Sequence, residues 1–169
     1  MPDDSEKEKL DRLRGLTDQA FDGIKAEMKR LKLDRGKAAY RRPLDLLEEA
    51  YLAIRYPVAA KGGASLPLLA LRGSIDRSIE ELIRRSPAQQ KGEKRRDRVL
   101  SIGLHCGKKG LALAHFDTLA AEDEAVNQEL SGKGTQATPD RPELARQFLR
   151  AAQLLRALLA SVDEALLKP

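Results

Sequence analysis

The sequence predicts an all-α fold, a single-domain helical bundle of five or six helices. Apolar residues recur every three or four positions through nearly the whole chain, which is the spacing of one helix face. No stretch keeps the period-two alternation of a half-buried strand for long. The length of 169 residues is typical of one domain, and no repeat of fixed period indicates a solenoid. We therefore expect residues 1–169 to form one helical domain.

The first three helices are predicted from their apolar faces. The first has its apolar stripe over residues 10–31, and Ser5 with Glu8 forms a predicted capping box at its start. The next apolar stripe covers residues 33–54 and contains Pro43, so this helix either is kinked there or begins at the proline, a favoured first-turn residue. The third helix begins at Ser65 and ends before Ser86-Pro87. Its predicted core face consists of Leu68, Leu71, Ile75, Ile79 and Leu82.

The second half of the chain is less regular. Residues 88–97 have no apolar periodicity, and residues 131–139 are rich in glycine, serine and threonine, so both are expected to be flexible loops. Between them, a helix interrupted by glycines is predicted within residues 99–116, and a short helix with an acidic outer face within residues 118–130. The face of the former is Val99, Ile102, Cys106, Leu113 and Phe116.

The last helix is the clearest. Asp140 is its predicted cap, Pro142 lies in its first turn, and its apolar stripe continues as far as Val162 and Leu166. A stripe this wide is typical of a helix in the middle of a bundle or against a second subunit.

Composition excludes several classes of protein. No apolar run approaches the roughly 18–20 residues of a membrane span, and the first residues are acidic, unlike a basic leader. The single cysteine, Cys106, excludes an internal disulfide and a cysteine-based zinc site. We therefore expect a soluble, cytoplasmic protein that does not contact a membrane.

Positive charge is concentrated in one segment, residues 84–109. This segment holds nine bases and two acids, a net charge of +7, whereas the whole chain has a net charge of +5 and the remainder is therefore −2. Such a concentration attracts a polyanion or an acidic protein, although no aromatic residue is interleaved for stacking on bases. We call these nine cations the basic patch. They are Arg84, Arg85, Lys91, Lys94, Arg95, Arg96, Arg98, Lys108 and Lys109.

Arg98 and His105 are the one titratable pair whose spacing suggests catalysis. They are seven positions apart, which on a helix places them two turns apart on one face. Arginine followed by histidine after six residues resembles the R-x4–6-H motif of the HEPN family, small all-α ribonucleases and modules related to them. The resemblance covers eight residues, and Val99 stands where the family often has a polar residue. A histidine with a purely structural role is the alternative.

The HEPN resemblance implies a specific chemistry. It implies a metal-independent ribonuclease in which two such motifs meet across a dimer. His105 would be the acid–base group and Arg98 would hold the scissile phosphate, roles that suit imidazole and guanidinium.

Other reactive groups predict no site. Residues 103–110 lack the glycine spacing of a phosphate-binding loop, and His105 and His115 lack the i, i+4 spacing of metal ligands. We expect no cofactor and no metal. The leading hypothesis is a non-enzymatic accessory or interaction subunit with a protein partner, and a second copy of this chain is one candidate. The alternatives are the HEPN-like ribonuclease and a direct RNA- or DNA-binding module.

Overall fold

The helices pack around α6 in the computed structural model, which describes residues 4–35, 42–56, 65–87, 92, 94–131 and 141–169. In chain order the elements are α1 (Asp4–Arg30), α2 (Pro43–Arg55), α3 (Ser65–Arg84), α4 (Arg95–Cys106), α5 (Leu113–Leu130), α6 (Arg141–Ala160) and a 3₁₀ turn, η1 (Glu164–Leu166). These residues form no strand, and one isolated β-bridge joins Gly107 to Val162. The predicted all-α bundle of five or six helices is confirmed.

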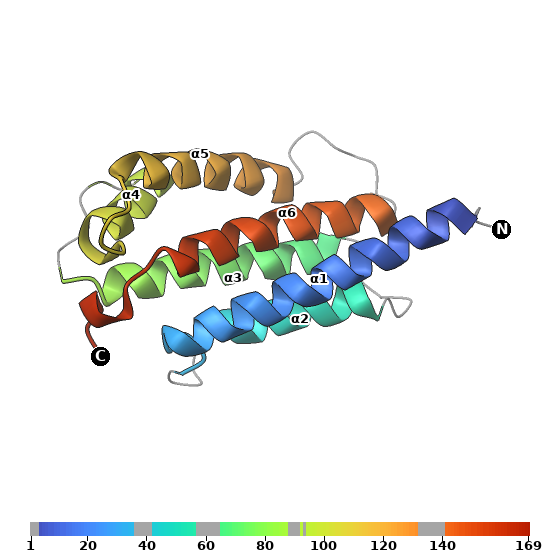
Figure 1. Cartoon of the computed structure of the whole chain (residues 1–169), viewed down its shortest axis with the longest axis horizontal. Helices are drawn as coiled ribbons and strands as arrows, with labels where there is room; N and C mark the ends of the chain where they lie inside the picture. Colours follow the sequence, from blue (N-terminus) through green and yellow to red (C-terminus); the bar gives the residue numbers. More distant parts are fainter. Residues whose placement is uncertain (1–3, 36–41, 57–64, 88–91, 93, 132–140) are drawn as a thin grey trace.

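The central helix, α6, lies between α1 and α5 and also packs against α3 (Figure 1). Phe148, Leu155 and Leu159 of α6 are completely buried. A helix with neighbours on several sides needs a wide apolar stripe, and this segment carries one. The sequence predicted this helix either in the middle of a bundle or against a second subunit, and the structure places it in the middle of the bundle.

The predicted core face of the third helix is confirmed, because all five of its residues are buried in α3. In α1, Ile24 is completely buried. The second helix is not kinked at Pro43 but begins there. At the first position of a helix, the missing N–H of proline costs no helical hydrogen bond. The backbone N–H of Arg42 donates to the Asp45 carboxylate at 3.2 Å, which satisfies a donor at the start of this helix.

The predicted loop at residues 88–97 is wrong at its end, because α4 begins at Arg95. The Arg95 side chain bonds to carboxylates of α3 and α5, and this tertiary contact anchors a first turn that has no apolar periodicity. Residues 88–91 and 93 of that predicted loop lie outside the described residues.

The predicted helices within residues 99–116 and 118–130 have different boundaries. The chain leaves the helix after Cys106 and enters α5 at Leu113, five residues before the expected start. Gly110 has a φ of +90°, a value that favours glycine, and this lets the chain turn between the two helices. Leu113, expected in the core, is exposed as a result.

The predicted stripe of the last helix is too long. The helix ends at Ala160, so Val162 and Leu166 lie beyond it, Val162 buried and Leu166 exposed in η1. The predicted cap, Asp140, and all of the predicted loop at 131–139 except Ser131 lie outside the described residues.

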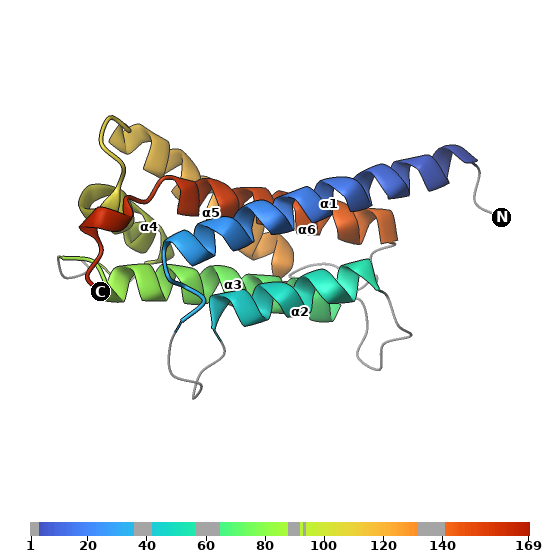
Figure 2. The same cartoon turned by 60° about the horizontal axis from the view of Figure 1, so that its bottom comes forward.

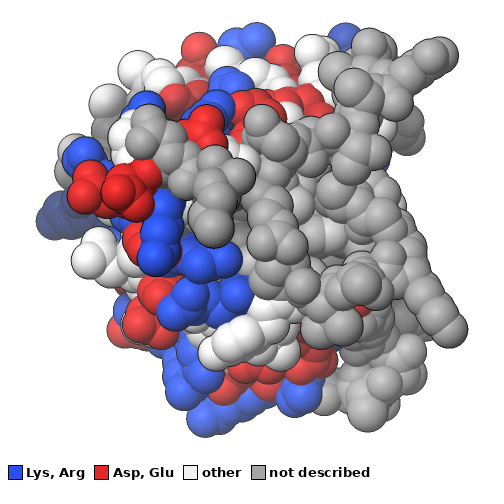
Figure 3. Space-filling model, turned by 90° about the vertical axis from the view of Figure 1, so that its right-hand side faces the viewer, with Lys and Arg blue, Asp and Glu red and all other residues white. Residues whose placement is uncertain are grey.

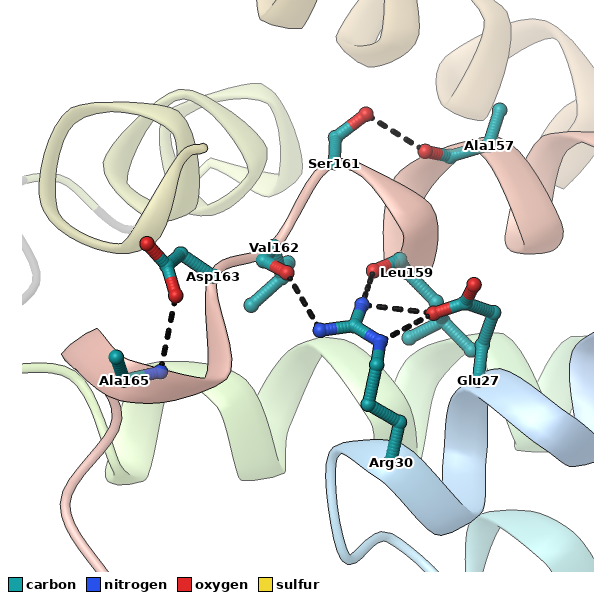
Figure 4. A network of polar contacts seen from close by, with 8 residues as sticks. All are labelled: Glu27, Arg30, Ala157, Leu159, Ser161, Val162, Asp163 and Ala165. Atoms are coloured by element: carbon teal, nitrogen blue, oxygen red, sulfur yellow. Dashed lines mark hydrogen bonds and ion pairs between the residues drawn. The ribbon is translucent and has the colours of Figure 1, made fainter. Parts of the chain in front are cut away.

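Arg30 connects the end of α1 to the end of α6 (Figure 4). Its guanidinium donates to the carbonyl oxygens of Leu159 at 2.9 Å and Val162 at 3.0 Å, and to the Glu27 carboxylate at 2.7 Å. Carbonyl groups at a helix C-terminus lack intrahelical partners and carry the negative end of the dipole, so a cation there contributes roughly 0.3–2 kcal/mol. Both helices run in the same direction in Figure 1, which brings these ends together.

Candidate functional site

Two cations of the basic patch are engaged at the end of α3. Arg84 is paired with Glu81 of the same helix, Nη2 to Oε1 at 2.6 Å, and this hydrogen bond raises the pKa of Arg84. Arg85 is buried and donates to the carbonyl oxygens of Leu31 at 2.5 Å and Lys168 at 2.9 Å. Arg85 thus holds the C-terminal segment against the end of α1.

Arg95 lies at the junction of three helices. Its guanidinium is paired with Asp76 of α3 and with Asp123 of α5, where the Nη2–Oδ1 distance is 2.9 Å. Although burial alone would lower it, the hydrogen bonds to Asp123 and Asp76 raise the pKa of Arg95. Burial raises the pKa of the Asp123 carboxyl, and Arg95 opposes that rise. This cation is fully committed to the fold.

Arg96 and Arg98 face different surroundings on α4. Arg96 is ion-paired with Asp117 at the surface. Arg98 lines a cavity of about 120 Å³ together with Asp76, Glu80, Ile79 and Arg95. The Arg98 Nε is buried and has no hydrogen-bond partner among the described residues.

The pair that resembles the HEPN motif does not share this cavity. Arg98 and His105 both lie on α4, as predicted, but His105 is not among the lining residues and is half-buried two turns further along. Asp76 and Glu80 line the same cavity as Arg98, and each is paired with another arginine, Asp76 with Arg95 and Glu80 with Arg77. The catalytic assignment of Arg98 and His105 stays a prediction.

Two other reactive side chains are occupied inside the bundle. Cys106 is completely buried, and burial raises the pKa of its thiol. The Ser161 hydroxyl donates to the carbonyl of Ala157, so its oxygen accepts a hydrogen bond from His115 Nε2 at 2.8 Å. Within the described ranges, no three His, Cys, Asp or Glu side chains are placed to hold a metal ion.

The turn between α4 and α5 carries two exposed cations of the basic patch, Lys108 and Lys109. All residues from Lys108 to Ala114 are exposed, and neither Lys108 nor Lys109 has an ion pair with the described residues. Three leucines in and next to this turn are exposed: Leu104, near the end of α4, is 63% exposed, Leu111 42% and Leu113 51%. We call Leu104 together with Lys108–Ala114 the α4–α5 corner.

The α4–α5 corner is held in place by backbone contacts. The N–H of Lys108 donates to the carbonyl of Ser161 at 2.9 Å, and the N–H of Asp163 donates to the carbonyl of Cys106 at 2.8 Å. A side chain at Gly103 would place its Cβ 2.3 Å from Phe116, so glycine there lets α4 and α5 approach closely. The exposed leucines and lysines therefore stand on a fixed backbone.

The remaining cations of the basic patch add little to this surface. Lys94 precedes α4, is exposed and has no ion pair among the described residues. Lys91 lies outside the described residues. The structure thus brings Lys108 and Lys109 together with exposed leucines, and turns Arg85 and Arg95 toward the interior.

A second open surface lies where α1 begins. The first turns of α1 extend past the start of α6 in both ribbon views (Figures 1 and 2). Figure 3 faces this end, where lysines and arginines lie next to groups of carboxylates on the described surface. A hollow of about 670 Å³ there is lined by Glu6, Lys9, Arg12, Leu13, Leu16, Pro142 and Arg146.

Sequence reasoning missed the residues that divide the basic patch. Asp123 is buried in a helix for which only an acidic outer face was predicted. Its position among the buried Leu119, Ala120 and Val126 was the available signal, since a carboxylate there needs a cation. For the α4–α5 corner, the available signal was the apolar run Leu111–Ala114, which directly follows the possible turn residue Gly110.

None of the described helices combines the length and the apolar content that crossing a bilayer requires.

Comparisons with known proteins find no protein that is similar to this chain. No protein-family model, no curated protein and no solved structure matches this chain.

Proposed function

We propose that this protein is a non-enzymatic interaction subunit that binds an acidic, partly apolar surface of a partner protein through its α4–α5 corner. The observation that carries the proposal is the run of exposed residues Lys108–Ala114, which joins two lysines to two leucines. No acidic residue occurs between Arg98 and Phe116, so the local sequence offers nothing to neutralise these lysines.

Leucines and lysines contribute different terms to such a contact. Burying a leucine side chain in an interface stabilises the complex by about 1.5–3 kcal/mol relative to leaving it in water. Lysines at the edge of the contact select an acidic partner and speed association. Together they favour a partner with an apolar recess bordered by carboxylates.

The fixed backbone of the α4–α5 corner supports the same proposal. Ordering side chains and loops on binding reduces affinity, and a surface that is already ordered avoids much of that loss. The bonds from Lys108 to Ser161 and from Asp163 to Cys106 hold the turn before any partner arrives.

The two alternatives have less support. A nucleic-acid-binding module would need several cations facing phosphates, but Arg84, Arg95 and Arg96 are already paired with carboxylates. A HEPN-like ribonuclease would need Arg98 and His105 to act on one phosphate, but His105 does not line the cavity that Arg98 lines. We therefore favour the interaction subunit.

A binding assay with defined probes tests the proposal. The probes are a labelled helical peptide of alternating leucine and glutamate faces and a labelled oligouridine of similar length, each followed by fluorescence anisotropy. The parent protein should bind the peptide, and both Lys108→Glu/Lys109→Glu and Leu111→Ser/Leu113→Ser should weaken that binding about tenfold or more, a loss of about 1.4 kcal/mol.

Matched controls are available outside the α4–α5 corner. Lys29→Glu and Leu52→Ser change an exposed lysine of α1 and an exposed leucine of α2, and both should bind the peptide like the parent. Equal binding by the corner variants would contradict the proposal. Binding of the oligouridine alone would favour the nucleic-acid module, and cleavage of it that is lost in His105→Ala would favour the ribonuclease.

A further inference from the structure

Three segments meet at one end of the bundle and line a small cavity, which we call the end cavity. The end of α1, the end of α3 and the C-terminal turn lie together there in both ribbon views (Figures 1 and 2). The end cavity has a volume of about 200 Å³. Drug-sized ligands occupy pockets of about 300–1,000 Å³, so this cavity suits a smaller occupant. Its lining residues are Arg30, Lys32, Arg85, Glu164, Leu167 and Pro169.

Arg30 is already committed to the fold. Its guanidinium donates to two carbonyl oxygens at the end of α6 and is ion-paired with Glu27 (Figure 4). That carboxylate balances the charge of Arg30. The side-chain charge that an occupant of the end cavity meets therefore comes mainly from Lys32, Arg85 and Glu164.

Arg85 is a buried cation without a carboxylate partner. The residue is only 7% exposed, and its Nε and Nη1 donate to the carbonyl oxygens of Lys168 and Leu31. Its Nη2 forms no hydrogen bond with the described residues, and the guanidinium has no ion pair among them. Carbonyl groups stabilise a guanidinium but do not cancel its charge, and buried charges in proteins are normally paired. An anion in the end cavity supplies such a partner.

Lys32 reaches the end cavity from an unusual backbone conformation. Its φ is 58°, in the left-handed region that favours glycine. The N–H of Leu33 donates to the carbonyl of Met28 at 2.8 Å, and the N–H of Lys32 donates to that of Lys29 at 3.2 Å. This is the Schellman ending of a helix, in which glycine usually occupies the position of Lys32. Residues other than glycine in such conformations are concentrated at binding sites.

The charges of the end cavity do not cancel one another. Lys32 is exposed and has no ion pair with a described residue. Glu164 is also exposed, and neither it nor Pro169 forms an ion pair within the described ranges. The side chains of Lys32, Arg85 and Glu164 together leave one positive charge in excess. Water and salt screen the exposed Glu164 more than the buried Arg85.

We propose that the end cavity binds a small phosphate-type oxyanion between Lys32 and Arg85. Arginine binds phosphate through directed N–H groups and lysine binds it as a point charge, so the two side chains suit this ligand. The bound anion gives the Arg85 guanidinium the charge partner that the described residues do not provide. Inorganic phosphate and the phosphate group of a small ester share this chemistry.

Isothermal titration calorimetry with inorganic phosphate, glycerol 3-phosphate and acetate tests the proposal. The parent protein should bind one of the phosphate probes at least about tenfold more tightly than acetate, because phosphate has more charge and more acceptor oxygens. Tighter binding of inorganic phosphate identifies the free ion as the occupant, and tighter binding of glycerol 3-phosphate identifies an ester. Acetate binding as tight as that of both phosphates would overturn the proposal.

Lys32→Gly separates binding from stability, because its effects on the two are opposite. The variant removes a cation from the end cavity and places glycine at a left-handed position. Its phosphate dissociation constant should rise about tenfold or more, whereas its unfolding temperature without phosphate should also rise. Lys29→Ala is the matched control, since this exposed lysine of α1 does not line the cavity, and it should bind phosphate like the parent.

Two further variants test the other charges of the end cavity. Arg85→Ala should abolish phosphate binding, and Glu164→Gln should tighten it, because this substitution removes a negative charge next to the anion. Unchanged far-ultraviolet circular dichroism shows that each variant is folded. Parent-like binding by Lys32→Gly, or no binding of either phosphate probe by the parent at millimolar concentrations, would overturn the proposal. The end cavity shares no lining residue with the α4–α5 corner, so these results leave the peptide-binding test unaffected.

Discussion

Cations of the basic patch have different roles in two regions of the molecule: in one they are paired inside the fold, and in the other they are exposed to solvent. At the junction of α3, α4 and α5, Arg95 is paired with Asp76 and Asp123 and supports the fold. At the α4–α5 corner, Lys108 and Lys109 point to solvent beside exposed leucines. Only 13 positions separate Arg95 from Lys108 along the chain. A local excess of charge thus shows where cations are abundant, and only the partners brought in by the fold show which of them remain available.

The largest expected effect is on the junction, from Arg95→Ala. This variant leaves the buried Asp123 carboxylate without its main cation, and breaking a buried ion pair in this way destabilises a protein by about 3–5 kcal/mol. Urea unfolding followed by circular dichroism measures the loss.

Arg96→Ala is the matched control for this variant. The neighbouring Arg96 is paired with Asp117 at the surface, so its removal should lower the free energy of unfolding by only about 0–1 kcal/mol. If both variants lost the same free energy of unfolding, the buried ion pair of Arg95 would contribute no more to stability than the surface pair of Arg96.

The next effect is on the contact between α4 and α5 that supports the α4–α5 corner. Gly103→Ala forces its Cβ against Phe116 and should destabilise the protein by about 1–3 kcal/mol. Gly15→Ala changes a helical glycine with nothing within 4 Å and should instead stabilise it by about 0.4–1 kcal/mol. Thermal unfolding of both variants measures the sign of each stability change. A Gly103→Ala variant more stable than the parent would contradict the close approach of α4 and α5 at this glycine.

A smaller effect concerns pH at the junction. Burial raises the pKa of Asp123 and Arg95 opposes that rise, so removing Arg95 raises this pKa further. An acid whose pKa is higher in the folded state than in the unfolded state loses stability as pH rises through the folded pKa. The loss caused by Arg95→Ala should therefore be smaller at about pH 4 than at pH 7. A loss that is constant over this interval, measured by urea unfolding, would contradict the assignment.

The smallest effect is expected from Leu111→Ser/Leu113→Ser. Leu111 is 42% exposed and Leu113 51%, so each substitution should change the free energy of unfolding by no more than about 0.5 kcal/mol. The same variant is expected to lose peptide binding, which separates stability from recognition. A loss of several kcal/mol on urea unfolding would show that these leucines belong to the core.

Helix positions were largely predictable from the sequence, because a core face repeats locally. Ile75 and Leu82 are buried at the spacing that predicted them. Helix ends were less predictable where tertiary contacts decide them. The start of α4 depends on carboxylates 19 and 28 positions from Arg95, which no local pattern contains.

The candidate site was predictable only in part, for the same reason. Lys108 and Lys109 could be named from the sequence as part of a basic segment. The apolar periodicity predicted Leu113 in the core, because it assumed a continuous helix. The chain instead turns at Gly110, and Leu113 is exposed. The burial of Asp123 depends on three helices meeting, and its pairing with Arg95 could not be read from either segment alone.

The pairing of α1 with α6 has a consequence for the order of folding. The hydrogen bond from Arg30 to Leu159 joins residues 129 positions apart, so this packing partner of α1 is synthesised long after α1 itself. Contacts between residues so far apart form slowly, because a long loop must close first. On the ribosome, α1 lacks its packing partner α6 until that segment emerges. During that interval the nascent chain is most vulnerable to aggregation.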